Sequence, residues 1–189
     1  MTEKAVEAAA PALERAGSLR AIGWVVAAGS SVAALALFGA EPRAAVAVFF
    51  LCVLVAVSVV DIERRIIPNR IVLPATALVL AAQIALAPDR ALEWVAASLG
   101  AALFLLLPLL VYPAGMGLGD VKLALLLGAG LGWAVVPAFA VGFTAAALVG
   151  IAMIAYGGLA ARKTTIPFGP FLSLGAAVAL FLSQGPYTG

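Results

Sequence analysis

Long apolar segments without charge alternate with short polar segments along most of the chain. Each apolar segment has close to the number of residues that an α-helix needs to cross the hydrocarbon core of a bilayer, which is about 20. Seven such segments can be marked, at residues 22–40, 44–60, 71–87, 94–112, 121–137, 138–160 and 168–183. The pattern predicts an all-α fold, a polytopic membrane helix bundle of about seven transmembrane helices.

The apolar run at residues 121–160 is long enough for two spans, and we divide it after Pro137. Gly128, Gly130 and Gly132 interrupt its first half, and Trp133 is of a type common at membrane interfaces. Gly128 and Gly132 are four residues apart. This small-xxx-small spacing predicts a close contact with another helix.

The first 21 residues differ from the rest because they carry three acids and three bases. They lack the basic start, clean apolar run and cleavage site of a signal peptide. We assign residues 1–21 to a cytoplasmic N-terminal segment, residues 22–183 to a membrane-embedded domain and residues 184–189 to a short tail. The N-terminal segment has an interfacial helix as one option, with Leu13 and Leu19 among its apolar positions.

The distribution of basic residues predicts the orientation. With a cytoplasmic N-terminus, only Arg43 and Arg90 lie on the outer side. The nine basic residues then on the inner side are Lys4, Arg15, Arg20, Arg64, Arg65, Arg70, Lys122, Arg162 and Lys163. An excess of Lys and Arg in cytoplasmic loops is the usual arrangement in membrane proteins, so we expect a cytoplasmic N-terminus.

Composition narrows the possible chemistry. Hydrophobic residues make up 65% of the chain and charged residues 11%, whereas about a quarter of a soluble domain is charged. There is no histidine and a single cysteine, Cys52, which excludes a Ser-His-Asp triad, a histidine-ligated metal and a Cys-x-x-Cys zinc site. Catalysis would have to use carboxylates, hydroxyls or lysine, and we predict no metal and no cofactor. Cys52 lies inside an apolar segment, where we expect a packed and inert thiol.

Three acidic residues lie at predicted inner helix ends, namely Asp61, Glu63 and Asp120. An acid at such a position is also an ordinary interfacial residue, so its place alone leaves its role open. For Glu63 we expect an ion pair with Arg64 or Arg65, the alternative being attraction of a basic substrate segment.

Motifs around the aspartates carry more information. Asp120 follows three glycines at alternate positions in residues 115–119, which allow close backbone approach, although a flexible turn is the simpler interpretation. Asp61 lies seven residues before the Pro-Asn pair at 68–69. A third segment, 166–176, contains two prolines that restrict the backbone. For residues 166–170 of this segment, the role is either a structural re-entry into the membrane or the shaping of a cleft.

These three segments together resemble the motifs of the type IV prepilin peptidases, which belong to the GxGD class of membrane aspartic proteases. Residues 116–123 resemble the second catalytic motif of that family, Asp61 with residues 68–69 the first, and residues 166–176 a third segment. The resemblance implies that Asp61 and Asp120 are catalytic. The motif residues to which it gives supporting roles are Gly117, Gly119, Lys122, Pro68, Asn69, Pro167, Gly169 and Pro170.

The resemblance further implies a membrane aspartic endopeptidase of the bacterial inner membrane. Such an enzyme removes the basic leader from type IV prepilins or pseudopilins at the cytoplasmic face. The expected partners are that protein substrate and the lipid bilayer, with no nucleic acid, and the oligomeric state stays open. Bifunctional members carry one more span and a domain with paired Cys-x-x-Cys motifs, associated with methylation of the new N-terminus. Neither is present in this sequence, so we expect cleavage without N-methylation.

Two other classes of protein remain as alternatives. A small transporter coupled to protons or cations would place acids near the middle of a span, and the seven predicted spans contain none. A non-catalytic assembly subunit is the other alternative, although both motif aspartates are present.

Overall fold

The computed structural model describes residues 3–39, 41–112, 117–157 and 166–183, with side chains from residue 17 onward. Within these ranges there are helices and no strands. Several residues used in the predictions lie outside the described residues, namely Gly115, Met116, Arg162, Lys163 and the tail at 184–189.

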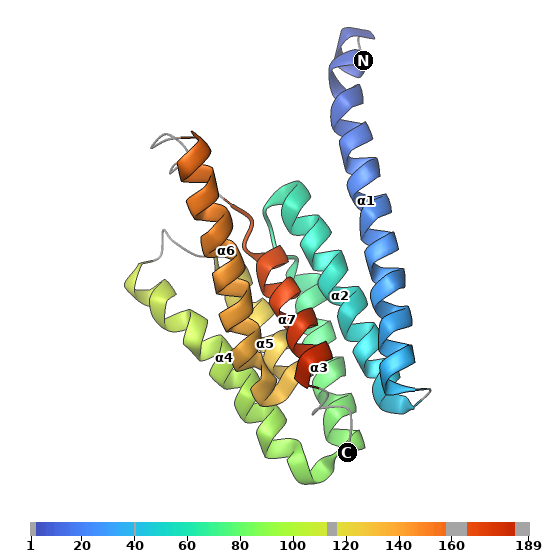
Figure 1. Ribbon diagram of the computed structural model, residues 1–189, viewed down its shortest axis with the longest axis vertical. Helices are drawn as coiled ribbons and strands as arrows, with labels where there is room; N and C mark the ends of the chain where they lie inside the picture. Colours follow the sequence, from blue (N-terminus) through green and yellow to red (C-terminus); the bar gives the residue numbers. More distant parts are fainter. Residues whose placement is uncertain (1–2, 40, 113–116, 158–165, 184–189) are drawn as a thin grey trace.

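Seven α-helices and two short 3-10 helices follow one another along the described chain (Figure 1). They are α1 (Glu3–Phe38), α2 (Pro42–Arg64), α3 (Asn69–Leu86), η1 (Pro88–Arg90), α4 (Ala91–Val111), α5 (Leu118–Leu131), η2 (Gly132–Ala134), α6 (Val135–Gly157) and α7 (Gly169–Ser183). The predicted all-α bundle is confirmed. The first helix also extends back to Glu3, so the N-terminal segment and the first apolar run form one continuous helix.

The turn between α5 and α6 lies earlier than the sequence predicted. Gly132 takes a left-handed backbone conformation with φ of 57°, which glycine adopts without steric cost, and α5 ends there. Pro137 does not mark the division because it lies in the first turn of α6, where a missing backbone N–H breaks no helical hydrogen bond.

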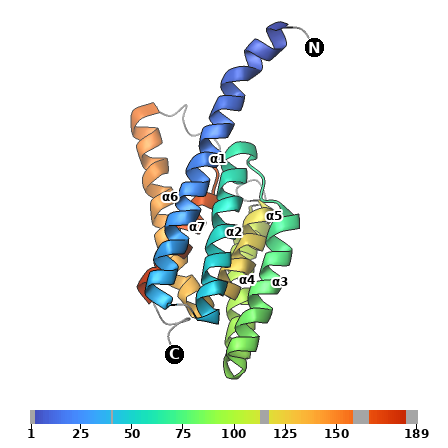
Figure 2. The same ribbon diagram turned by 90° about the vertical axis from the view of Figure 1, so that its right-hand side faces the viewer.

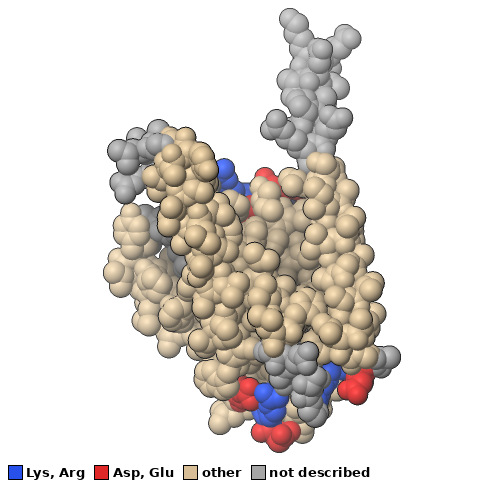
Figure 3. Space-filling view, viewed as in Figure 1, with Lys and Arg blue, Asp and Glu red and all other residues tan. Residues whose placement is uncertain are grey.

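Five segments of the described chain are long and apolar enough to cross a membrane. One of them, Leu118–Gly157, contains both α5 and α6, and the described part of α7 is shorter. On the face shown in Figure 3, charged side chains lie toward the two ends of the molecule, and a broad band between them is uncharged. This arrangement is that of a multi-pass membrane protein.

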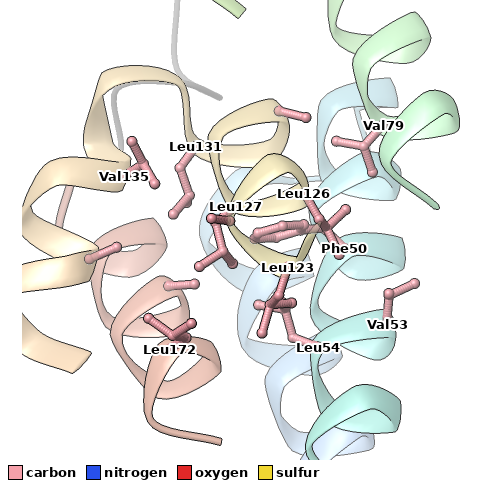
Figure 4. Packing of buried hydrophobic residues seen from close by; sticks show 14 of the residues in the cluster. Phe50, Val53, Leu54, Val79, Leu123, Leu126, Leu127, Leu131, Val135 and Leu172 are labelled. Atoms are coloured by element: carbon pink, nitrogen blue, oxygen red, sulfur yellow. The ribbon is translucent and has the colours of Figure 1, made fainter. Parts of the chain in front are cut away.

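Helix α5 lies at the centre of the bundle. It packs against α3, α4 and α7, and most of its side chains are buried. Leu123, Leu126 and Leu127 of α5 point toward Phe50 of α2 and Leu172 of α7 in the core (Figure 4). This packing fixes the first turn of α5 relative to α2, α3 and α7, whose ends form the site described below.

Of the two glycines whose spacing predicted a close helix contact, Gly128 makes one, whereas Gly132 lies in the turn after α5. At Gly128 a Cβ atom would collide with the backbone of Ala97 and Ser98 in α4. Helix α1 is packed far less extensively than α5. It lies at the edge of the bundle against α2 (Figures 1 and 2).

Candidate active site

Asp61 lies in the last turn of α2 and is buried, with 5% of its surface exposed. The helix stops just beyond it, because Arg65 takes a left-handed conformation with φ of 56° and donates its backbone N–H to the Asp61 carbonyl at 2.7 Å. The Oδ2 atom of Asp61 accepts the backbone N–H of Gly169 at 3.0 Å. Gly169 is the first residue of α7, so the positive end of that helix dipole faces the carboxylate.

A side chain at position 169 would disturb this contact. A Cβ atom on it would lie 2.8 Å from Asp61 Oδ2, closer than real Cβ atoms approach other atoms. The sequence singled out Gly169 as a motif residue but gave no reason for a glycine. The structure supplies one, which is direct contact of its backbone with a carboxylate 108 positions away in the chain.

Asp120 is the third residue of α5 and is also buried, with 8% of its surface exposed. Its Oδ2 atom accepts the backbone N–H of Gly117 at 3.3 Å. This is the half of a capping box in which an acid in the first turn bonds back to the residue before the helix. The carboxylate therefore satisfies a backbone donor at the end of α5 and is held in place by it.

The glycines before Asp120 have different roles. A Cβ atom on Gly119 would lie 2.8 Å from Cβ of Ile67, so this glycine allows the first turn of α5 to approach the segment that joins α2 to α3. Gly117 has φ of −90° and only ordinary contacts, so the structure shows no steric need for glycine there.

Asp61 and Asp120 line the same cavity, which has a volume of about 670 Å³. They are close enough for the charge of Asp61 to act on Asp120. The wall comes from the end of α2, the start of α3, the start of α5 and the segment before α7. Its other residues are Arg65, Ile66, Ile67, Asn69, Gly117, Leu118, Gly119, Lys122, Ile166, Pro167 and Phe168. The site is thus assembled at one end of the bundle from chain segments far apart in sequence.

The remaining motif residues support this wall. Pro68 precedes α3 and Asn69 begins it. The Lys122 ammonium donates to the Asn69 side-chain oxygen at 2.9 Å, which connects the starts of α5 and α3. Pro167 lines the cavity, and Pro170 lies in the first turn of α7, where no backbone N–H is needed. Of the two roles considered for residues 166–170, the structure therefore favours the shaping of the cleft.

Two sequence expectations near the site are wrong. Glu63 pairs with Arg20 of α1, with Nε–Oε1 and Nη2–Oε2 distances of 3.0 and 3.2 Å, and not with Arg64 or Arg65. The partner comes from a neighbouring helix 43 residues away, which local spacing does not reveal. Cys52 is exposed and not packed, because it lines an open groove beside α1, although its Sγ is 3.6 Å from Ser31 Oγ.

The sequence predicted about half of the cavity wall, and the residues that it did not single out are Arg65, Ile66, Ile67, Leu118, Ile166 and Phe168. Five of these six are ordinary apolar residues in a very apolar chain. Their one signal is position, because Leu118, Ile166 and Phe168 lie within the quoted motif segments and Ile66 and Ile67 lie directly before Pro68.

The arrangement suits one kind of chemistry. Two buried carboxylates in one cavity are the groups with which an aspartic protease activates water and protonates its substrate. No group of three or more potential metal ligands occurs among the described residues.

Comparison with known proteins agrees with this class. The type IV leader peptidase family matches residues 48–161, which contain both aspartates, and the chain belongs to this family. A prepilin leader peptidase/N-methyltransferase of Burkholderia pseudomallei (strain 1026b) is 37% identical over 163 residues, 82% of this chain and 52% of the relative. The protein of the same name from Bacillus subtilis (strain 168) is 35% identical over 146 residues, 75% of this chain and 57% of the relative.

A third relative with that name, from Pseudomonas aeruginosa, is 33% identical over 133 residues, 67% of this chain and 46% of the relative. The chain thus spans about half the length of the curated relatives it matches. No solved structure matches it significantly.

Proposed function

We propose that this chain is a membrane aspartic endopeptidase that removes the basic leader from type IV prepilins or pseudopilins. The observation that carries the proposal is the presence of two buried carboxylates, Asp61 and Asp120, on the wall of one cavity. Membership of the type IV leader peptidase family and the names of the relatives support the choice of substrate.

In the proposed mechanism the two carboxylates share one proton. The ionised one removes a proton from water, which attacks the scissile carbonyl, while the protonated one donates its proton to the carbonyl oxygen. The carboxylate that took the proton from water then gives it to the leaving amine, and the other carboxylate recovers a proton from a hydroxyl of the tetrahedral intermediate. The backbone N–H groups of Gly169 and Gly117 hold the two side chains in position. Because the pair titrates as a unit, we expect a bell-shaped pH dependence of kcat/KM that belongs to the pair.

We further propose that the cavity faces the cytoplasm and that these residues cleave without methylating the product. The excess of basic residues at the end of the bundle that holds the cavity supports the orientation. The single cysteine of the sequence leaves no paired Cys-x-x-Cys motif of the kind associated with methylation in bifunctional members.

The test is cleavage of a co-expressed prepilin, followed by mass spectrometry. Asp61→Asn and Asp120→Asn should each lower the cleavage rate at least about 100-fold, the usual contribution of a general acid or base. Asp89→Asn is the matched control, because this exposed acid lies at η1, far from the cavity in sequence, and does not line it. Cleavage that survives either cavity substitution would overturn the mechanism. A methylated product would overturn only the proposal that the product is not methylated.

A further inference from the structure

An apolar groove runs along the outside of the bundle where α1 and α7 lie on either side of α2. The floor comes from α2 between residues 51 and 62, and one wall from α1 between residues 19 and 30. The other wall is a single stripe of α7, namely Pro170, Ser173, Leu174 and Ala177. These positions follow the spacing of one helix face. Three helices therefore each present one face to a common groove of about 290 Å³, which we call the α7 groove.

The inner end of the groove adjoins the candidate active site. Ile62 on the floor follows Asp61 directly, and Pro170 on the wall follows Gly169, whose N–H bonds the Asp61 carboxylate at 3.0 Å. The floor is about 17 Å long at 1.5 Å per residue, roughly half of the hydrocarbon core. From Ile62 and Pro170, each next in the chain to a residue of the candidate active site, the groove extends toward the middle of the bilayer.

The α7 wall has the features of a helix-docking surface. Ser173 and Ala177 are small residues four positions apart, which allows another helix to approach closely. Ser173 is 93% buried and its hydroxyl has no hydrogen-bond partner among the described residues. The other groove hydroxyls, on Ser30 and Ser58, bond to carbonyls of their own helices.

A second groove, between α1 and α3 and called the α3 groove below, differs from the α7 groove in charge. It is lined by Arg20, Glu63 and Arg64, so its charged mouth carries one more positive than negative group. Among the described residues, none that lines the α7 groove is charged. Because Arg20 and Glu63 pair with each other, Arg64 is the excess charge at the first mouth, and this difference favours the α7 groove for a substrate with a basic leader.

We propose that the α7 groove holds the apolar helix of the substrate, the segment that follows the scissile bond. With the start of that helix at Ile62 and Pro170, the junction between leader and helix falls at the level of Asp61. This inference rests on the proposed function and adds to it the surface that selects the substrate.

Photo-crosslinking tests the location. A p-benzoyl-phenylalanine placed at Leu174 should crosslink to a co-expressed prepilin through its apolar segment, in an Asp120→Asn background that slows consumption of the precursor. The matched control is the same group at Ile71, an exposed residue of the α3 groove. Crosslinks from Ile71 alone, or from neither position, would overturn the assignment.

Kinetics distinguishes the groove from the catalytic proposal. Ala177→Trp fills the groove, whereas Ala140→Trp places the same bulk in a groove between α4 and α6. For a full-length precursor, we expect Ala177→Trp to lower kcat/KM at least about tenfold, mainly through KM, and Ala140→Trp to change it less than about twofold. For a precursor that ends shortly after the scissile bond, both variants should match the parent.

Each failure has its own signature. Equal effects on both precursors, or no effect on either, would overturn the groove while leaving the peptidase intact. Failure of the parent protein to cleave either precursor would instead overturn the proposed function. Leu174→Trp is a second variant for the case in which Ala177→Trp does not fold, since Leu174 is half exposed and its replacement leaves the core unchanged.

Discussion

Two glycines let the backbone approach its neighbours directly at the site: Gly169 contacts Asp61, and Gly119 contacts Ile67. An added Cβ atom would lie 2.8 Å from the Asp61 carboxylate in the first case and 2.8 Å from Ile67 in the second. The two contacts fix the start of α7 against one aspartate and the start of α5 against the cavity wall. The positions of the carboxylates are therefore sensitive to a single methyl group.

Gly169→Ala should lower cleavage at least about tenfold, which corresponds to a loss of about 1.4 kcal/mol in transition-state stabilisation. The added methyl group has to displace the Asp61 carboxylate, which leaves the Gly169 N–H without its 3.0 Å bond. Gly150→Ala is the matched control, because a Cβ atom there meets nothing within 4 Å. Equal activity of the two variants, measured on a prepilin, would contradict this role of Gly169.

The Lys122–Asn69 contact should contribute much less. It is exposed, and exposed polar contacts of this kind are worth about 0.2–1 kcal/mol. We expect Lys122→Met and Asn69→Ala each to lower kcat/KM by no more than about fivefold. Their effects should not add in a double-mutant cycle, because both remove the same bond. Strictly additive losses would show that Lys122 acts on the substrate instead, and Arg70→Ala serves as the neighbouring control.

At the scale of elements, the packing of α4 on α5 depends on one glycine. A Cβ atom on Gly128 would overlap the backbone of Ala97 and Ser98, which cannot move as a flexible side chain could. Gly128→Ala should therefore destabilise the bundle by about 1–3 kcal/mol, the usual cost of overpacking. Gly100→Ala in α4, where nothing lies within 4 Å, should be neutral or stabilising. Thermal unfolding in mild detergent measures both, and equal Tm values would contradict the contact.

The elements could be predicted well because crossing a bilayer requires long apolar segments. The spans expected at 71–87 and 94–112 differ by at most three residues at either end from α3 (Asn69–Leu86) and α4 (Ala91–Val111). The division between α5 and α6 was misplaced because both Gly132 and Pro137 are turn formers. Only the backbone shows that Gly132 turns and that Pro137 sits in the first turn of a helix.

The site was predictable only in part. The motifs pointed to Asp61 and Asp120, and the structure brings both to one cavity. The bond from Gly169 to Asp61 and the Arg20–Glu63 pair join residues 108 and 43 positions apart. Such contacts depend on how the helices pack, and the spacing of residues along one helix does not contain that information.

At the scale of the whole molecule, the two ends of the bundle differ in how many basic residues they carry. The cavity lies at the end that holds Arg65 and Lys122, and the opposite end carries the short loop with Asp89 and Arg90. Because basic loops usually stay on the cytoplasmic side, this asymmetry supports the proposal that the cavity faces the cytoplasm.

Cysteine labelling checks this orientation in a Cys52→Ser background. Asp89 and Arg70 are both exposed and lie at opposite ends of α3. A membrane-impermeant maleimide added to intact cells should label Asp89→Cys, and it should label Arg70→Cys only after lysis. The reverse pattern would place the cavity on the outer face and contradict the proposed orientation.

The short length of α5 has a consequence for how water, the second reactant in peptide hydrolysis, reaches the site. Its 14 residues span about 21 Å, whereas the hydrocarbon core is about 30 Å thick. Trp133, which is exposed just beyond the end of α5 opposite Asp120, is typical of a membrane interface, so the shortfall of α5 lies at its Asp120 end. Because α3, α4 and α7 surround α5, the shortfall is bounded by protein and by the cavity of about 670 Å³, not by lipid. Water for hydrolysis therefore has to reach the two buried carboxylates through the same cavity that a substrate chain would enter.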